Sequence, residues 1–200
     1  MATKAMISKG DDTVTIKPMH LQTIRLTLVG DSSLICHAWS HKAKQMMLDK
    51  QMKKAAGAKE AKDPQRDFEE SLYPHPDGGY GFPTIALKSA AVDACSHVSS
   101  LTKVAARGAF HIDGEMALIK GKPTMREDMV RIAMGTADIR HRGEFKTWSV
   151  TFDIRINVNV LSTDQVVNLF ETAGFAIGIG EWRPAKDGSH GMFHVQKRGE

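Results

Sequence analysis

Positive charge is concentrated in one stretch of this chain, residues 42–66. The stretch carries eight basic side chains against three acidic ones, an excess of five, whereas the whole chain has a net charge of +4. The basic residues are Lys42, Lys44, Lys50, Lys53, Lys54, Lys59, Lys62 and Arg66. A one-signed excess of this kind attracts polyanions, and nucleic-acid phosphates are the usual partner. The alternatives are a solvated surface helix and an arm that meets an acidic protein surface.

A second group of residues suited to phosphate binding lies near the C-terminus. Gly178 and Gly180 have no side-chain bulk, so backbone N–H groups there can approach a phosphate closely. Arg183, Lys186 and His190 add positive charge and hydrogen-bond donors beside these glycines. We therefore predict phosphate contact in this segment. A set of tight β-turns is the alternative, because such turns use the same residue types.

The residue types needed for catalysis do not occur in recognisable motifs. There is no paired-carboxylate motif, no phosphate-binding P-loop and no Gly-x-Ser-x-Gly sequence. His37 and His41 are spaced as two ligands on a helix would be, but no glutamate lies between them and no third ligand follows in register. We predict no catalytic residue, no metal and no cofactor.

Charges of both signs are interleaved in residues 126–146. The basic residues are Arg126, Arg131, Arg140, Arg142 and Lys146, and the acidic ones are Glu127, Asp128, Asp138 and Glu144. Mixed charges indicate a solvated surface, or a contact between neighbouring subunits of an assembly.

Apolar patterning predicts the strands that must position these groups. It is clearest over residues 145–160, where Trp148, Val150, Phe152, Ile154, Ile156 and Val158 share one face. Residues 21–28 and 192–195 are also predicted strands, residues 34–39 are a further apolar piece, and residues 175–180 form a strand of small residues. Asp113-Gly114, between residues 109–112 and 116–119, predicts a tight hairpin. Residues 120–138 are predicted to be a loop, and residues 13–16 a frayed arm or a short edge strand.

Capping residues and helix formers predict three helices. A basic helix follows Ser40 and extends towards residue 66, a second helix covers residues 86–101, and a third covers residues 165–173 and ends at Gly174. The order is then β-α-β-β-α-β, so the predicted fold class is α+β, with a ferredoxin-like or RRM-like core and a basic helical insertion. One domain spans residues 1–200, and residues 40–84 form the inserted arm and a Gly/Pro-rich loop.

Composition narrows the class of protein. Hydrophobic residues make up 42% and charged residues 25%, as in ordinary globular proteins. No apolar run approaches the roughly 18 residues of a membrane span, so we predict a soluble, cytoplasmic protein without membrane contact. Cys36 and Cys95 are predicted to be reduced core residues.

Two segments resemble the RAMP superfamily, in particular the backbone subunits of CRISPR surveillance complexes that polymerise along guide RNA. Residues 81–90, Gly-Phe-Pro-Thr-Ile-Ala-Leu-Lys-Ser-Ala, are similar to the family's Pro-Gly-Ser-Ser-Leu-Lys-Gly signature, although Thr84-Ile85 stand where the family prefers Gly-Ser. Residues 174–183 and 188–193 resemble the family's C-terminal glycine-rich loop. The resemblance covers the core and not the basic arm, and a small phage or mobile-element relative fits it as well.

The resemblance implies a non-catalytic protein that binds the backbone of single-stranded RNA, or of DNA. It also implies a homo-oligomer along the strand or a subunit of a nucleoprotein complex. Lys88 would meet a backbone phosphate at the N-terminus of its helix. The predicted binding residues are Lys42, Lys44, Lys50, Lys53, Lys54, Lys88, Arg107, Gly178, Gly180, Arg183, Lys186 and His190.

Two other functions stay open. A phage-type structural or CRISPR-interfering protein would act through protein–protein contacts. Some members of the superfamily cleave RNA with an acidic loop residue, and Asp31, after the first predicted strand, is the candidate in this chain.

Overall fold

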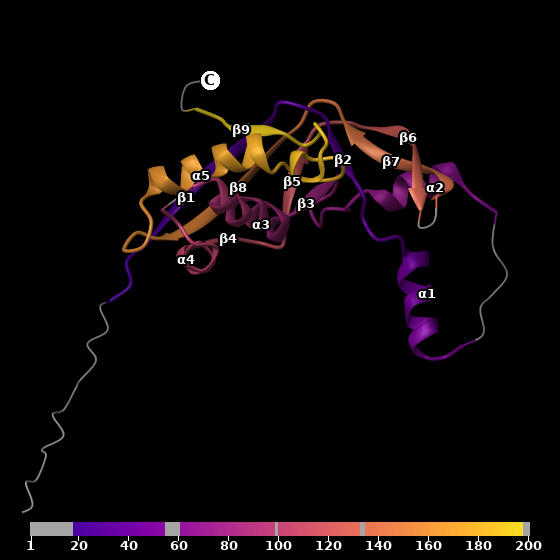
Figure 1. The fold of residues 1–200 in the computed structure, drawn as a ribbon, viewed down its shortest axis with the longest axis horizontal. Coiled ribbons are helices and arrows are strands. Elements are labelled where there is room, and N and C mark those ends of the chain that lie inside the picture. The colour runs from indigo at the N-terminus through magenta and orange to yellow at the C-terminus, as the bar shows by residue number, and fades with distance from the viewer. Residues whose placement is uncertain (1–17, 55–60, 99, 133–134, 198–200) are drawn as a thin grey trace, which may run out of the picture.

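The computed structural model describes residues 18–54, 61–98, 100–132 and 135–197, which form two antiparallel sheets with helices packed against them (Figure 1). The prediction for residues 13–16 lies outside the described residues. Within the described ranges, no helix is long and apolar enough to cross a membrane.

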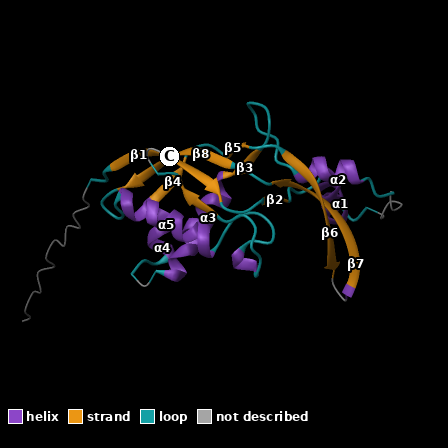
Figure 2. Ribbon diagram, turned by 90° about the horizontal axis from the view of Figure 1, so that it is seen from above, coloured by secondary structure: helices purple, strands orange, loops and turns teal. Residues whose placement is uncertain are grey.

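The larger sheet forms the ferredoxin-like core. Its strand order is β3-β5-β8-β1-β9, and β4 also pairs with β8. The strands are β1 (Leu21–Gly30), β3 (Gly81–Pro83), β4 (Phe110–Ile112), β5 (Met116–Lys120), β8 (Ser149–Asn157) and β9 (Phe193–Val195). Helices α3 (Thr84–Ala94), α4 (Lys103–Ala109) and α5 (Thr163–Ala176) lie on one side of this sheet (Figure 2). The last strand lies beside the first and the first beside the long β8, as in a β-α-β-β-α-β unit, which confirms the predicted fold class.

Alternation in β8 builds the core of this sheet. Val150, Phe152, Ile154 and Ile156 are buried, and the residues between them are less so. They face α5, whose Phe170 ring lies 5.7 Å from the ring of Phe152 and 5.9 Å from that of Phe110. Helix α5 begins at a capping box formed by Ser162 and Gln165. The predictions of this strand, this helix and their shared face are confirmed, although Phe145 belongs to the preceding strand and Val158 is exposed.

The predicted hairpin around Asp113-Gly114 is wrong. Strands β4 and β5 do not pair with each other; both pair with β8 and form one interrupted strand along it, and β3 pairs with the other side of β5. Gly114 has φ of +77°, and the Asp113 amide still donates to the Asp153 carbonyl across the sheet. The dipeptide therefore interrupts this strand as a bulge does, and glycine readily adopts the positive φ that the interruption requires.

The second sheet corrects another prediction, the loop at residues 120–138. It has the order β2-β7-β6, where β2 is Leu34–Cys36, β6 is Pro123–Ile132 and β7 is Thr136–Phe145. Strands β6 and β7 pair in register from Pro123 and Phe145 to Ile132 and Thr136. Cross-strand ion pairs stand where apolar pairs usually stand, so the sequence lacks the alternation by which strands are recognised.

The described residues of the basic arm form two helices instead of one. Helix α1 (His41–Gln51) starts at Ser40, whose hydroxyl accepts from the Ala43 amide, and it ends before Lys53, which has φ of +54°. Helix α2 (Pro64–Ser71) is separate and packs on β7, where the Gly143 amide donates to the Ser71 hydroxyl at 2.7 Å. The Ala38 amide donates to the Ser71 carbonyl at 2.8 Å, so the chain just after β2 and the end of α2 lie side by side.

Two predictions in the C-terminal segment are wrong. Gly174 does not end its helix, because α5 continues to Ala176, and residues 177–180 form a loop instead of a strand. A Cβ at Gly174 would lie 1.7 Å from the Phe193 carbonyl oxygen, so this glycine lets α5 lie directly against β9.

Helix α3 ends earlier than predicted, at Ala94, and a 3-10 turn follows at Cys95–His97.

The two cysteines lie in the core. Cys36 and Cys95 are buried free thiols, as predicted, and burial raises the pKa of Cys36 to about 12.

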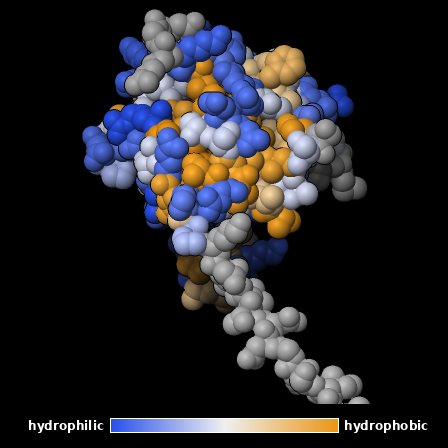
Figure 3. Space-filling model, turned by 90° about the vertical axis from the view of Figure 1, so that its left-hand side faces the viewer, coloured by the Kyte–Doolittle hydropathy of each residue, from blue (hydrophilic) through white to orange (hydrophobic). Residues whose placement is uncertain are grey.

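At the end of the larger sheet where β1 begins, four apolar side chains are exposed: Met19, Leu21, Val158 and Val160. Figure 3 shows the apolar surface on this end of the molecule among polar side chains.

Candidate nucleic-acid interface

Helix α1 presents the predicted lysines to solvent. It has no buried residue and projects from the second sheet (Figure 1). Lys42, Lys44 and Lys50 are exposed on the helix, and Lys53 and Lys54 are exposed just beyond it. The first turn contains no acidic residue to offset Lys42 and Lys44, which stand at the positive end of the helix dipole. Of these residues, Lys54 pairs with Asp49 at 3.1 Å.

A groove of about 610 Å³ separates α1 from β7. One wall comes from Ala43, Met46 and Met47, which share a face of α1 by their spacing. The facing wall comes from β7 and α2. Met46 and Met47 are 63% and 46% exposed, so the helix face that would ordinarily pack on the sheet is open.

Trp39 stands at the edge of this groove. Its side chain is 60% exposed, and it also lines a second groove, of about 500 Å³, with His41, Lys44 and Tyr73. A large indole exposed between two grooves is unusual for a tryptophan, and it offers a flat surface beside the lysines of α1. In the sequence Trp39 ends an apolar run that suggests a buried strand, so its exposure was not predicted.

The facing wall is rich in cations that share carboxylates. Lys62 and Arg140 both pair with Asp138, at 2.6 and 3.5 Å, and the hydrogen bond from Lys62 lowers the pKa of Asp138. Arg142 and Arg126 both pair with Asp128, at 3.2 and 2.8 Å. Each carboxylate therefore serves two cations. The acids that line the groove are Asp138 and, on α2, Asp67 and Glu70, so the wall holds charges of both signs.

Two nitrogens in the facing wall have no hydrogen-bond partner among the described residues. They are His141 Nδ1 and Arg142 Nε, on side chains that are 9% and 5% exposed. Buried polar atoms without partners are rare in folded proteins and are typical of sites that bind water or a ligand.

Three amides of the glycine-rich loop donate to carbonyl groups of the protein itself. The Gly178 amide donates to the Ala173 carbonyl, the Ile179 amide to the Gly191 carbonyl and the Glu181 amide to the Ile35 carbonyl. A Cβ at Gly180 would lie 2.5 Å from the Ile35 carbonyl oxygen, at a φ of +77°. Gly180 therefore serves the close packing of the loop against β2, and Gly178 serves packing within the loop, where a Cβ would lie 2.7 Å from Pro184.

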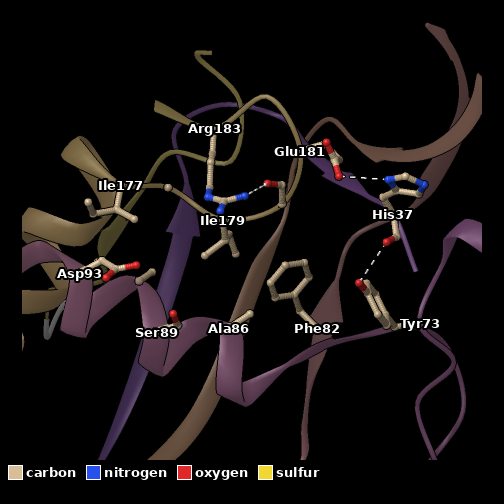
Figure 4. Close-up of a pocket in the computed structure, with 13 residues that line it drawn as sticks. His37, Tyr73, Phe82, Ala86, Ser89, Asp93, Ile177, Ile179, Glu181 and Arg183 are labelled. Carbon is tan, nitrogen blue, oxygen red and sulfur yellow. Dashed lines mark hydrogen bonds and ion pairs between the residues drawn. The ribbon is translucent and has the colours of Figure 1, made fainter. Parts of the chain in front are cut away.

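The loop borders a cleft of about 230 Å³ against α3 (Figure 4). Arg183 lines this cleft and donates to the Gly180 carbonyl at 2.9 Å. Across it, His37 Nδ1 lies 3.0 Å from Glu181 Oε1, a contact that lowers the pKa of Glu181. The cleft holds charges of both signs, with Asp93 on α3, so it has no net preference for an anion.

The other predicted residues are dispersed. Lys186 is exposed, and His190 Nδ1 lies 2.8 Å from Ser33 Oγ, which donates to Glu144 at 2.7 Å. Lys88 does not face the glycine-rich loop: its ammonium donates to the Arg107 carbonyl at 2.9 Å and lies 5.7 Å from the Phe110 ring centroid. Burial lowers the pKa of Lys88. Arg107 itself is exposed on α4.

The open face of the larger sheet lacks a stacking surface of the RRM type. Its side chains pair with one another: Arg25 with Asp153 and Arg155 with Asp113, both at 2.7 Å. The exposed Trp and Phe side chains of the described ranges are Trp39, Phe175 and Trp182, and none belongs to a strand of this sheet. At its rim, His194 Nδ1 lies 2.6 Å from Asp31 Oδ1. In the same described ranges, no three His, Cys, Asp or Glu side chains cluster as a metal site would require.

Comparisons with known proteins add little to this geometry. No family model matches the sequence, and no curated protein matches it. The crystal structure of Cmr6 from Pyrococcus furiosus superposes with a TM-score of 0.48 at 10% sequence identity, covering 90% of this chain and 100% of that chain. That likeness is too distant to say what this chain binds.

Proposed function

We propose that this protein is a non-catalytic binder of single-stranded nucleic acid, RNA in preference to DNA, and that it grips the phosphate backbone with the basic arm. The observation that carries the proposal is the exposure of α1, which holds three lysines, is followed by two more and buries no side chain. A helix that adds nothing to the core but keeps an excess of positive charge is best explained by an anionic partner.

Electrostatic binding of a single strand makes a direct prediction. Fluorescence anisotropy with labelled single-stranded RNA and DNA should give a dissociation constant that rises steeply with salt and depends little on sequence. Substituting Lys42, Lys44, Lys50 and Lys53 with Gln should weaken binding roughly tenfold to a hundredfold at low salt. It should also reduce the slope of log K against log salt by about 3, or about 0.7 per lost phosphate contact.

The matched control removes the same charge from another surface. Lys120, Lys122, Lys146 and Lys197 are exposed and lie outside the arm. Their substitution with Gln should leave the salt slope nearly unchanged. Equal losses in the two variants would mean that net charge alone attracts the strand. No binding by the unmodified protein at low salt would favour a protein partner for the arm.

Assembly as repeated subunits along the strand is part of the proposal. It predicts that light scattering detects particles whose mass grows with the length of the RNA added, at fixed protein concentration. Discrete complexes of constant mass would limit the protein to a single subunit in each nucleoprotein complex.

RNA cleavage is a second candidate, favoured by the short contact between Asp31 and His194. With its Nδ1 held by Asp31, His194 would have Nε2 free for proton transfer. The Asp31 side chain is 48% exposed and the His194 side chain 41% exposed, so both are accessible. If this function holds, incubated RNA should be cut, and Asp31→Asn should slow cutting by about 100-fold or more. Intact RNA on a denaturing gel, with or without divalent metal, would reject it.

A further inference from the structure

The groove between α1 and β7 has the chemistry of a site for one flat, polar, unstacked ring. Its entrance carries the indole of Trp39, and one wall is thioether and methyl surface from Met46, Met47 and Ala43. The other wall carries charges of both signs, Lys62, Arg140 and Arg142 with Asp67, Glu70 and Asp138. Its volume of about 610 Å³ lies within the usual size of small-molecule sites, about 300–1,000 Å³.

We propose that this groove receives a single unstacked nucleobase of the bound strand, which stacks on Trp39. This inference rests on the proposed function and adds a base-binding site to a backbone-binding arm. Sequence-tolerant stacking on aromatic side chains accompanies a basic track in many single-strand binders. Trp39 is the exposed aromatic side chain that adjoins the lysines of α1, whereas Trp182 belongs to the loop after the glycines.

The wall opposite α1 provides donors for the polar parts of the same nucleotide. Arg140 and Lys62 share the carboxylate of Asp138, so their remaining N–H groups can donate to a phosphate next to the stacked base, while the positive charge that attracts the strand comes from the lysines of the arm. Arg142 Nε and His141 Nδ1 lack partners among the described residues, and they offer polar contacts to base or sugar oxygens after a small side-chain movement.

A protein segment is the main competing occupant, since methionine and tryptophan also line peptide-binding grooves. The charge of the arm favours the nucleotide. The lysines beside Trp39 would repel a basic peptide. The acids that line the groove itself are Asp67, Glu70 and Asp138.

The test compares a normal single strand with an abasic strand of the same length, which keeps the phosphates and lacks the bases. Trp182→Phe serves as the background, so that the remaining indoles are Trp39 and the buried Trp148, which is 4% exposed. Titration with the normal RNA should quench Trp39 fluorescence, and titration with the abasic strand should not.

Affinity provides the second readout. Trp39→Leu should weaken binding of the normal strand by about fivefold to 150-fold, the range expected for one stacked base, and should leave binding of the abasic strand unchanged. Because Trp39 is mostly exposed, this variant should fold normally, and the fluorescence titration does not depend on it. Equal losses of affinity for both strands, or no quenching of Trp39, would overturn the base site. Salt-sensitive binding of the abasic strand would still support backbone binding in that case. If neither strand binds, the proposed function fails and the base site fails with it.

Discussion

Replacing Asp128 with Ala is expected to lower the free energy of unfolding by about 3–5 kcal/mol. The Asp128 side chain is 8% exposed and accepts from Arg126 and from Arg142, whose own side chain is 5% exposed. Removing the carboxylate leaves the Arg142 guanidinium buried with its Nη1 unpaired, beside an Nε that already has no partner among the described residues. Loss of one member of a buried ion pair is costly because the remaining charge stays out of water.

The matched control is Asp153→Ala in the larger sheet. Asp153 also pairs with an arginine, Arg25, through two contacts of 2.7 Å, but the arginine is 71% and the aspartate 37% exposed. Urea unfolding followed by circular dichroism should therefore show a large fall in the midpoint for Asp128→Ala and almost none for Asp153→Ala. Similar midpoints for the two variants would show that water reaches the Asp128 pair and that the second sheet does not depend on it.

Replacing Gly174 with Ala should destabilise the protein by about 2–4 kcal/mol, although alanine is the better helix former. In an exposed helix interior the change would stabilise by about 1 kcal/mol. Here the new Cβ would lie 1.7 Å from the Phe193 carbonyl oxygen, which is backbone and has no rotamer to change. Helix α5 and strand β9 must then move apart, and the loosened packing around Phe193 costs more than the gain in helix propensity returns.

Gly108 is the matched control, because it lies in α4 with nothing within 4 Å of an added Cβ. Gly108→Ala should raise the thermal midpoint slightly and Gly174→Ala should lower it by roughly 4–16 °C, as measured by differential scanning calorimetry. Stabilisation by both substitutions would mean that α5 and β9 can separate at little cost.

The fold could be predicted from the sequence where burial is one-sided. Strand β8 and helix α5 each bury one face, so apolar residues recur with the period of the element. The β6–β7 hairpin was missed because Arg126, Asp128 and Arg142 occupy positions on its more buried face. Ion pairing between strands replaces apolar alternation there, and which charges will pair is decided only when the strands meet.

The sequence located one wall of the candidate site, the arm, but not the wall that faces it. The charge excess located the arm, because one-signed charge is visible in one stretch of sequence. Its facing wall comes from β7, where Arg140 and Arg142 lie far beyond α1 in the chain. The glycine-rich loop misled in the opposite direction. Gly180 is required for tight packing on β2 and Gly178 for packing within the loop, and sequence alone does not separate these needs from phosphate binding.

The hydrogen bond from the Ala38 amide to the Ser71 carbonyl makes the arm an excursion with joined ends. Closing a longer loop costs only slightly more entropy than closing a shorter one, and α1 contributes nothing to the core. The length and charge of α1 can therefore drift in evolution almost independently of the ferredoxin-like body, whereas α2 is held by its packing on β7. In the same way, a helix of different specificity could be transplanted between these two points to redirect the protein to another ligand.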